Sequence, residues 1–222
     1  MSEKVKELEN LAKFLGQMMP EITDGEEVRT IPKNAIRMRR DQSPDTIVSG
    51  MRTNRDMTKI LRAGPDKTCT FPNTVTTVCA YAFHRARASS VRLNEGLRVL
   101  KHGCFASSGI RRLVLPSSVE SIDAGAFCDC RLLEYADLRA AHSLKAIGDS
   151  AFNLCQRLRR VLLNDGLETI GGSCFLLSCL KEVTIPGSVR KIGRRAFSHT
   201  HLRCARFRGA PARDSSGCSG ES

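Results

Sequence analysis

Phenylalanine recurs along this chain at nearly constant intervals, and no other sequence feature constrains the fold so strongly. Of the nine Phe residues, six follow one another at spacings of 22, 22, 25, 23 and 22, at positions 83, 105, 127, 152, 175 and 197. The residue before each of them is Ala or Cys, and a β-branched or Leu side chain stands five and eight residues before it. Four positions that recur together over six units indicate a repeat protein.

Each unit also contains a second apolar cluster, about ten residues after its Phe. Clusters such as Leu113-Val114-Leu115 and Val183-Thr184-Ile185 are rich in β-branched side chains, which is typical of a short strand. Pro116 and Pro186 follow two of these clusters, and proline ends a strand because it lacks the N–H donor. We therefore expect each unit to contain a strand, a turn, a short extended V-x-x-I segment and a tight turn that leads to the Phe.

Three segments carry the repeat motif most clearly: 113–130 (LVLPSSVESIDAGAFCDC), 144–163 (LKAIGDSAFNLCQRLRRVLL) and 180–197 (LKEVTIPGSVRKIGRRAF). They resemble the BspA-like leucine-rich repeats, whose pattern is close to LxxIxLPxxVxxIGxxAFxxC. The resemblance implies a solenoid of 22–25-residue units with short parallel strands and turns. Relatives of this kind are chiefly bacterial and protist surface proteins, some of them adhesins.

The repeat pattern divides the chain into four predicted regions. Val5, Leu8, Leu11, Leu15 and Met18 recur at helical spacing before Pro20, so residues 1–24 are expected to form an amphipathic helical cap. That helix could instead dock on a partner or form a short coiled coil. Residues 25–69 are interpreted as degenerate repeats with an irregular insertion, with Leu61 at the Phe position, and 70–208 as the leucine-rich repeat solenoid. Residues 209–222 have the composition of a disordered tail.

Alternation along the strands predicts which side chains face outward. If Leu113 and Leu115 point into the core, the residues on either side of Leu113 point out, and the same holds for the other units. In leucine-rich repeats this strand face is the concave one, where partners commonly dock. We therefore predict a partner-binding surface formed by Arg92, Arg112, Val114, Tyr135, Asp137, Arg160, Leu162 and Thr184. Tyr and Arg beside apolar residues are typical of interaction hot spots, although isolated exposed apolar residues also occur on ordinary solvated faces.

The chain is strongly basic, with 35 Lys and Arg against 23 Asp and Glu and a formal charge of +12. Basic clusters occur at 157–160, 190–195 and 203–208, which favours a partner with an acidic surface. RNA or another polyanion is an alternative partner, but no nucleic-acid-binding motif accompanies the clusters and they lack aromatic residues for stacking on bases.

No motif in the sequence indicates catalysis, a cofactor or a metal. The sequence contains no G-x-S-x-G element and no G-x-x-x-x-G-K phosphate loop. The ten cysteines form no C-x-x-C pair, and many occupy repeat positions, such as Cys104 and Cys174 directly before Phe. We therefore expect a protein without enzymatic activity, with no catalytic residues, no metal site and no cofactor.

The charges at Glu3, Lys4, Lys6 and Glu7 interrupt the apolar stretch that a signal peptide requires, and no apolar run is long enough to cross a membrane. We therefore expect a cytoplasmic protein without membrane insertion. The sequence favours a non-catalytic protein–protein interaction module, either an adaptor or a subunit of a larger assembly. The alternatives are a cell-surface adhesin, as in the BspA-like relatives, and a basic platform for RNA or another polyanion.

Overall fold

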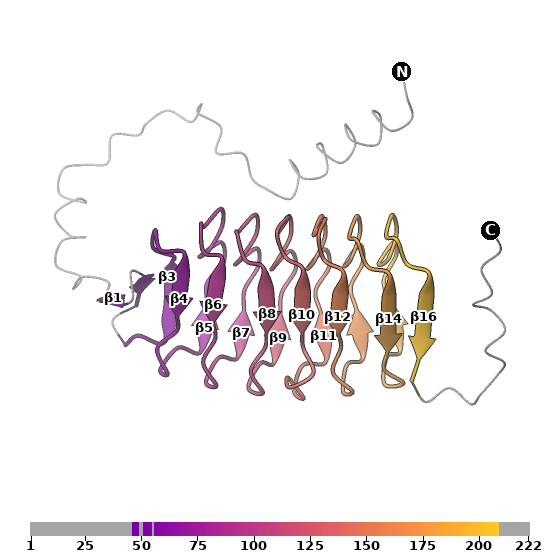
Figure 1. The fold of residues 1–222 in the computed structure, drawn as a ribbon. Helices are drawn as coiled ribbons and strands as arrows, with labels where there is room; N and C mark the ends of the chain where they lie inside the picture. Colours follow the sequence, from indigo (N-terminus) through magenta and orange to yellow (C-terminus); the bar gives the residue numbers. More distant parts are fainter. Residues whose placement is uncertain (1–45, 49–50, 55, 209–222) are drawn as a thin grey trace, which may run out of the picture. The chain divides into compact units, whose positions relative to one another are not determined.

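The computed structural model describes residues 46–48, 51–54 and 56–208 of the chain. The chain divides into two compact units, Met1–Ser43 and Pro44–Ser222, and all of the described residues belong to the second. The predicted helix in 1–24, the part 25–45 of the predicted degenerate repeats and the tail 209–222 therefore lie outside the described residues. Within the second unit the chain winds into a β-solenoid, which confirms the predicted fold class (Figure 1).

One side of the solenoid is a row of seven short strands, one from each turn, which we call the long-strand row (Figure 1). The strands follow each other at intervals of one repeat, and those that pair do so in parallel. They are β4 (Thr68–Thr70), β6 (Ser90–Arg92), β8 (Arg112–Val114), β10 (Tyr135–Asp137), β12 (Arg160–Leu162), β14 (Glu182–Ile185) and β16 (Cys204–Phe207).

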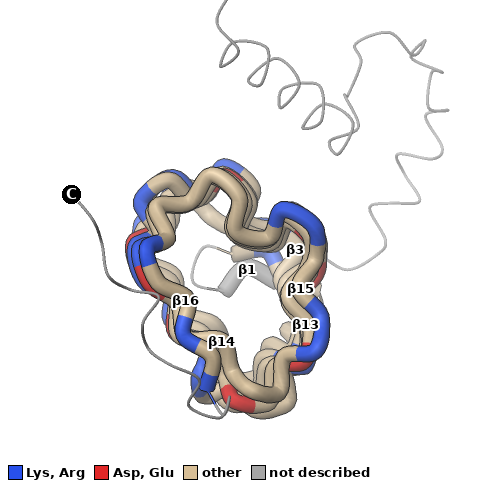
Figure 2. The backbone as a smooth tube through the Cα atoms, turned by 90° about the vertical axis from the view of Figure 1, so that its right-hand side faces the viewer, with Lys and Arg blue, Asp and Glu red and all other residues tan. Residues whose placement is uncertain are grey.

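The opposite side is a nine-stranded sheet (Figure 2). Its repeat strands have two residues each and pair in parallel, so that Ile147, for example, lies between Ile122 and Ile170. They are β5 (Thr77–Val78), β7 (Val99–Leu100), β9 (Ser121–Ile122), β11 (Ala146–Ile147), β13 (Thr169–Ile170) and β15 (Lys191–Ile192).

The sheet begins with three strands that do not follow the repeat. β1 (Thr46–Val48) and β2 (Met51–Thr53) form an antiparallel pair, and β2 pairs antiparallel with β3 (Lys59–Arg62), which then pairs in parallel with β5. The predicted placement of Leu61 at the Phe position was wrong. Ile60 aligns with Val78, and Leu61 is 38% exposed, because the first turn is shorter than the later repeats.

The tight turns between the two sides explain why a small residue precedes each Phe. The Phe N–H donates to the carbonyl oxygen of the small residue in the next unit, as Phe152 does to Cys174 at 2.8 Å and Phe175 to Ala196 at 2.8 Å. These residues lie in the narrow space between successive units, and Ala151 and Cys174 are fully buried. A large side chain there would separate neighbouring turns, so the sequence keeps Ala or Cys.

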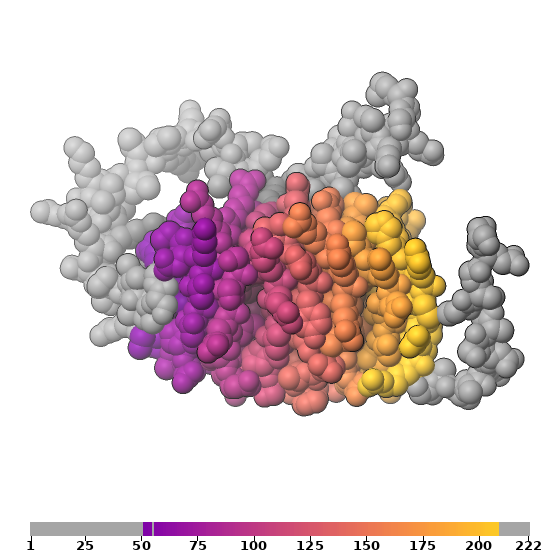
Figure 3. All heavy atoms as spheres, viewed as in Figure 1, coloured from indigo at the N-terminus to yellow at the C-terminus, as the bar shows by residue number. Residues whose placement is uncertain are grey.

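The Phe side chains stack into a continuous ladder through the core. Successive rings from Phe105 to Phe197 are nearly parallel, with centroids 5.1–5.4 Å apart, and the four rings from Phe105 to Phe175 are at most 1% exposed. No unit could bury this surface alone, because the faces of each inner ring stack on the rings of the units before and after it. The units accordingly follow one another as contiguous bands in sequence order (Figure 3).

Candidate functional site

The structure brings six of the eight predicted binding residues onto one three-stranded sheet, β8–β10–β12. The strands are in exact repeat register, so Arg112, Tyr135 and Arg160 form one row across the sheet. Val114, Asp137 and Leu162 form the second row. We call these six residues the central face.

Arg92 and Thr184, the other two predicted residues, lie on the neighbouring strands β6 and β14. These strands belong to the separate ladders β4–β6 and β14–β16, although all seven strands lie side by side in one row (Figure 1). Both side chains are exposed. They therefore flank the central face without being hydrogen-bonded into its sheet.

The predicted alternation of the strands is confirmed at the middle residue of each central strand. Leu113, Ala136 and Val161 are buried, at 5%, 0% and 3% exposure, and anchor the strands to the core. Arg112 and Arg160 are exposed, and Val114 is an exposed apolar side chain at 58%. The alternation is less complete around β10, where Tyr135 and Asp137 are half-buried.

Tyr135 is held at the centre by Arg112 over its ring and by Asp137 at its hydroxyl. The guanidinium carbon of Arg112 lies 5.0 Å from the centroid of the Tyr135 ring, which is a cation–π contact. The hydroxyl of Tyr135 donates a hydrogen bond to Oδ2 of Asp137 at 3.0 Å. Burial first, and then the hydrogen bond to Asp137, raise the pKa of the Tyr135 hydroxyl, so it stays protonated and able to donate at neutral pH.

Arg139 completes this cluster, and the sequence analysis did not identify it. Its Nε donates to Oδ1 of Asp137 at 3.0 Å, its Nη2 to Oδ2 at 2.7 Å, and its backbone N–H to Oδ1 at 3.1 Å. These bonds, with that of Tyr135, lower the pKa of Asp137 to about 2. The signal that could have found Arg139 is the long interval between Phe127 and Phe152, because the extra residues lengthen the turn in which Arg139 lies.

The cluster changes the expected electrostatics of the central face. The carboxylate of Asp137 accepts four hydrogen bonds, three of them from Arg139, so its charge is matched within the chain. Arg112 and Arg160 have exposed side chains. The face therefore presents a tyrosine between two arginines, with Val114 and the half-buried Leu162 beside them as apolar surface.

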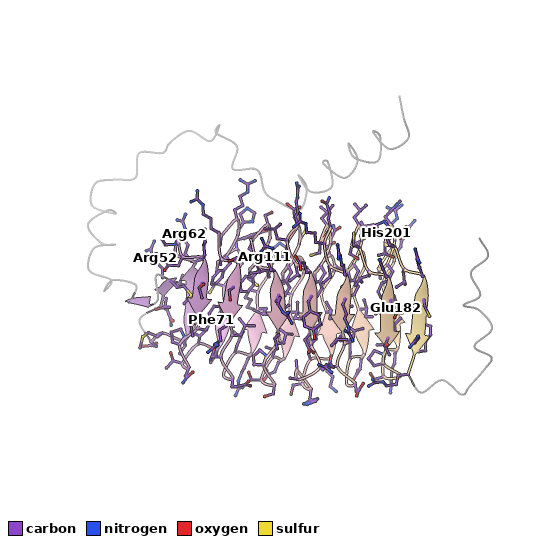
Figure 4. The ribbon with its side chains drawn as sticks, viewed as in Figure 1. Arg52, Arg62, Phe71, Arg111, Glu182 and His201 are labelled. Carbon is purple, nitrogen blue, oxygen red and sulfur yellow. The ribbon has the colours of Figure 1, made fainter. Side chains whose placement is uncertain are left out.

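Further positive charge surrounds the central face. Arg157 and Arg159 are exposed in the turn before β12, and Arg111 before β8 is paired with Glu134 at 3.8 Å, where both side chains are more than half exposed. Figure 4 labels Arg111 near the edge formed by the Phe-bearing turns, and Glu182 on the strand row. An exposed pair of this kind adds little to stability, but the excess of arginine gives this edge a positive potential.

The described residues contain no group of three or more His, Cys, Asp or Glu side chains arranged to hold a metal ion. The buried thiols serve the repeat instead. Cys130 donates to the carbonyl oxygen of Phe105 at 3.0 Å, and Cys155 to that of Phe127 at 3.2 Å. Burial raises the pKa of Cys130 to about 12, and a thiol in that state is neither a nucleophile nor a metal ligand at neutral pH. No helix long and apolar enough to span a membrane occurs in the part of the chain that the structure describes.

This architecture resembles that of known repeat proteins. Residues 66–141 match the family described as "BspA type Leucine rich repeat region (6 copies)". No curated protein matches the chain. Among solved structures, a leucine-rich repeat protein from Eubacterium ventriosum is 19% identical with a TM-score of 0.56, and the match covers 78% of this chain and 53% of that one.

Two further structures are similar to this chain. A leucine rich cell surface protein from Faecalibacterium prausnitzii is 21% identical with a TM-score of 0.49, over 72% of this chain and 54% of its own. The leucine-rich repeat protein of T. pallidum is 27% identical with a TM-score of 0.49, over 66% of this chain and 62% of its own. The chain thus spans little more than half the length of the first two structures. Residues 66–141 are thus a BspA-type leucine-rich repeat region, and the stacked Phe rings and parallel strands continue the same architecture beyond them.

Proposed function

We propose that this protein is a non-catalytic interaction module, an adaptor or assembly subunit, that binds another protein through the central face. Leucine-rich repeat proteins commonly bind other proteins, and one observation carries the proposal for this chain. Arg112, Tyr135 and Arg160 are adjacent in one row of three hydrogen-bonded strands. Tyr and Arg are the residue types that dominate binding energy in protein interfaces.

The partner surface that fits this row is acidic at its periphery and apolar at its centre. Arg112 and Arg160 offer guanidinium groups that pair with carboxylates in a two-point geometry. Asp137 does not oppose an acidic partner, because Arg139 already binds both of its oxygens. Val114, with 58% of its surface exposed, provides the apolar contact.

The backbone holds these side chains in a nearly fixed arrangement before binding. Each central strand is anchored by a buried residue, and the Phe ladder beneath fixes the spacing of the turns. A surface that is already ordered loses little conformational entropy when it binds. Rigid display of a few anchors therefore accounts for recognition without a pocket or a catalytic group.

We place this function in the cytoplasm. Cys130 and Cys155 are buried thiols at repeat positions, where they donate to backbone carbonyls. Free thiols used in this way suit a reducing compartment, where disulfides are rare.

Affinity purification of the tagged full chain from its own cells, with and without nuclease, tests the proposal. A defined set of proteins that survives nuclease and is lost with the double variant Tyr135→Ala, Arg160→Ala is the expected result. Loss of all bound material on nuclease treatment would instead favour RNA binding. Unchanged capture by the double variant would show that the central face is not the binding surface.

A further inference from the structure

The two ends of the solenoid differ. At the first end β3 is covered by the antiparallel strand β2, whereas at the other end β15 and β16 are the last strands of their rows. Side chains of the core ladder that earlier units bury are uncovered there. Ile192 is 43% exposed, while Ile170 one unit earlier is fully buried, and Phe207 on β16 is 59% exposed.

Backbone groups that are hydrogen-bonded between earlier units lack backbone partners among the described residues at this end. In the previous unit the carbonyl oxygen of Glu168 accepts from Arg190 and Lys191, and that of Ile170 accepts from Gly193. In the last unit the carbonyls equivalent to those of Glu168 and Ile170 belong to Arg190 and Ile192. Neither accepts a backbone hydrogen bond from a described residue. Likewise Phe175 donates its N–H to Ala196, but the N–H of Phe197 has no backbone acceptor among the described residues.

Charge indicates what would fit on this end. From β7 onward, the residue directly before each two-residue strand alternates between a cation and an anion in successive units. Arg98 pairs with Glu120 at 3.6 Å, and Lys145 pairs with Glu168 at 3.7 Å. Arg190 is the next residue of this row, and it follows Glu168 as a cation. A strand added beside β15 would continue the alternation if it placed a carboxylate next to Arg190.

The last units of the solenoid are rich in basic residues. No acidic residue occurs between Glu182 and Asp214, while Lys and Arg stand at positions 190, 191, 194, 195, 203, 206, 208 and 213. Arg208 reaches back to Asp165 of an earlier turn, at 2.7 Å. A second copy of the chain docked end to end would bring two such basic surfaces together, which like-charge repulsion opposes. Docking on the opposite end is also opposed, because β2 already covers β3.

We infer that this end of the solenoid is a second interaction site, which binds an acidic, partly apolar extended segment of a partner protein as one more strand beside β15. Strand addition supplies partners for the carbonyls of Arg190 and Ile192. A carboxylate of the segment pairs with Arg190, and an apolar side chain covers Ile192. The site is separate from the central face, and its test does not depend on that surface.

The chain itself supplies a probe for the test. Residues 164–178 form the segment that covers Lys145 and Ile147 within the solenoid, with Glu168 on the cation and Ile170 on the isoleucine. A labelled synthetic peptide of this sequence, with Ser in place of Cys174, can be titrated against the full chain by fluorescence anisotropy. A second peptide carrying Glu168→Lys serves as the charge-reversed control.

The site predicts a charge-swap pattern. The peptide with Glu168 binds the wild-type chain, and Arg190→Glu weakens this binding by about tenfold or more. The Glu168→Lys peptide shows the reverse preference and binds the Arg190→Glu variant better than the wild type. Arg87→Glu changes an exposed arginine at the other end of the array, and it leaves both affinities unchanged.

Three results would overturn the inference. Equal binding of both peptides would mean general attraction to a basic surface. Binding only after deletion of residues 209–222 would identify this chain's own tail as the occupant. A dimer in light scattering that the peptide dissociates would identify a second copy.

Discussion

Arg139 binds Asp137 through both carboxylate oxygens, at 3.0 and 2.7 Å, although only one residue separates them in the sequence. The contact lies at the end of β10, where the chain enters the longer turn before β11. It fixes the acceptor of the Tyr135 hydroxyl and thereby the position of the aromatic ring at the centre of the central face. One local ion pair therefore organises the surface proposed to bind the partner.

This arrangement predicts the acid titration of Asp137. Its pKa of about 2 lies below the ordinary value, mainly because of the hydrogen bond from the Arg139 side chain. A carboxyl with a lowered pKa stabilises the fold above its ordinary pKa, and this contribution disappears as the pH falls towards 2. In Arg139→Ala the pKa should rise towards about 3.9. Carbon-13 NMR of the Asp137 carboxyl measures both values, and an unchanged midpoint in the variant would show that Arg139 is not the cause.

The Phe ladder predicts that the cost of removing a ring depends on its place in the stack. Phe152 lies between two rings and is fully buried, so Phe152→Ala should lower the free energy of unfolding by about 3–5 kcal/mol. Phe197 stacks on Phe175 on one side and is only partly buried. Phe197→Ala should therefore cost clearly less. Urea unfolding followed by circular dichroism compares the two, and equal losses would contradict the role of stacking on both faces.

Two adjacent glycines provide a matched test of how closely the units approach. A Cβ on Gly171 would lie 2.5 Å from the backbone nitrogen of Asp149 and 2.6 Å from the carbonyl carbon of Gly148. On Gly172 the nearest atom is the carbonyl oxygen of Arg194 at 3.4 Å. Gly171→Ala should destabilise the chain by about 1–3 kcal/mol or more, because the clash is with backbone that cannot move aside.

Gly172→Ala should change the stability much less than Gly171→Ala. Both variants introduce the same methyl group into the same turn. Differential scanning calorimetry of the pair therefore distinguishes a clash with the neighbouring unit from the general effect of replacing a glycine. If Gly172→Ala lowered the melting temperature as much as Gly171→Ala, the close approach of the units would not explain the requirement for glycine.

Much of the fold follows from the sequence because each repeat restates the same constraints. The positions of Phe83 to Phe197 predicted the repeat and the spacing of its turns, and the alternation around Leu113 predicted which strand residues are buried. Such features depend on periodic patterns, and six repetitions make a periodic pattern unambiguous. The periodic pattern no longer predicts the positions of residues where the length of a unit changes.

Two of the features that the sequence did not reveal lie where the periodicity is interrupted. Leu61 was misplaced because the turn before β5 is short, so Ile60, not a residue 22 positions before Val78, aligns with Val78. Arg139 was missed because it lies in a lengthened turn that has no equivalent in the neighbouring units. The half-burial of Tyr135 follows from Arg112 and Asp137, and contacts between specific side chains are not encoded in a repeat pattern.

The dissociation constant of the purified partner for single variants tests the central claim most directly. Isothermal titration calorimetry would compare wild type, Tyr135→Ala and Arg160→Ala with the control Tyr81→Ala, Arg85→Ala, which removes the same residue types from a turn away from the central face. Each central-face variant should weaken binding by about 30-fold, the size expected of a hot-spot residue, with little change in thermal unfolding. The control should bind as the wild type does. Equal affinities for all of these variants would contradict recognition through Tyr135 and Arg160.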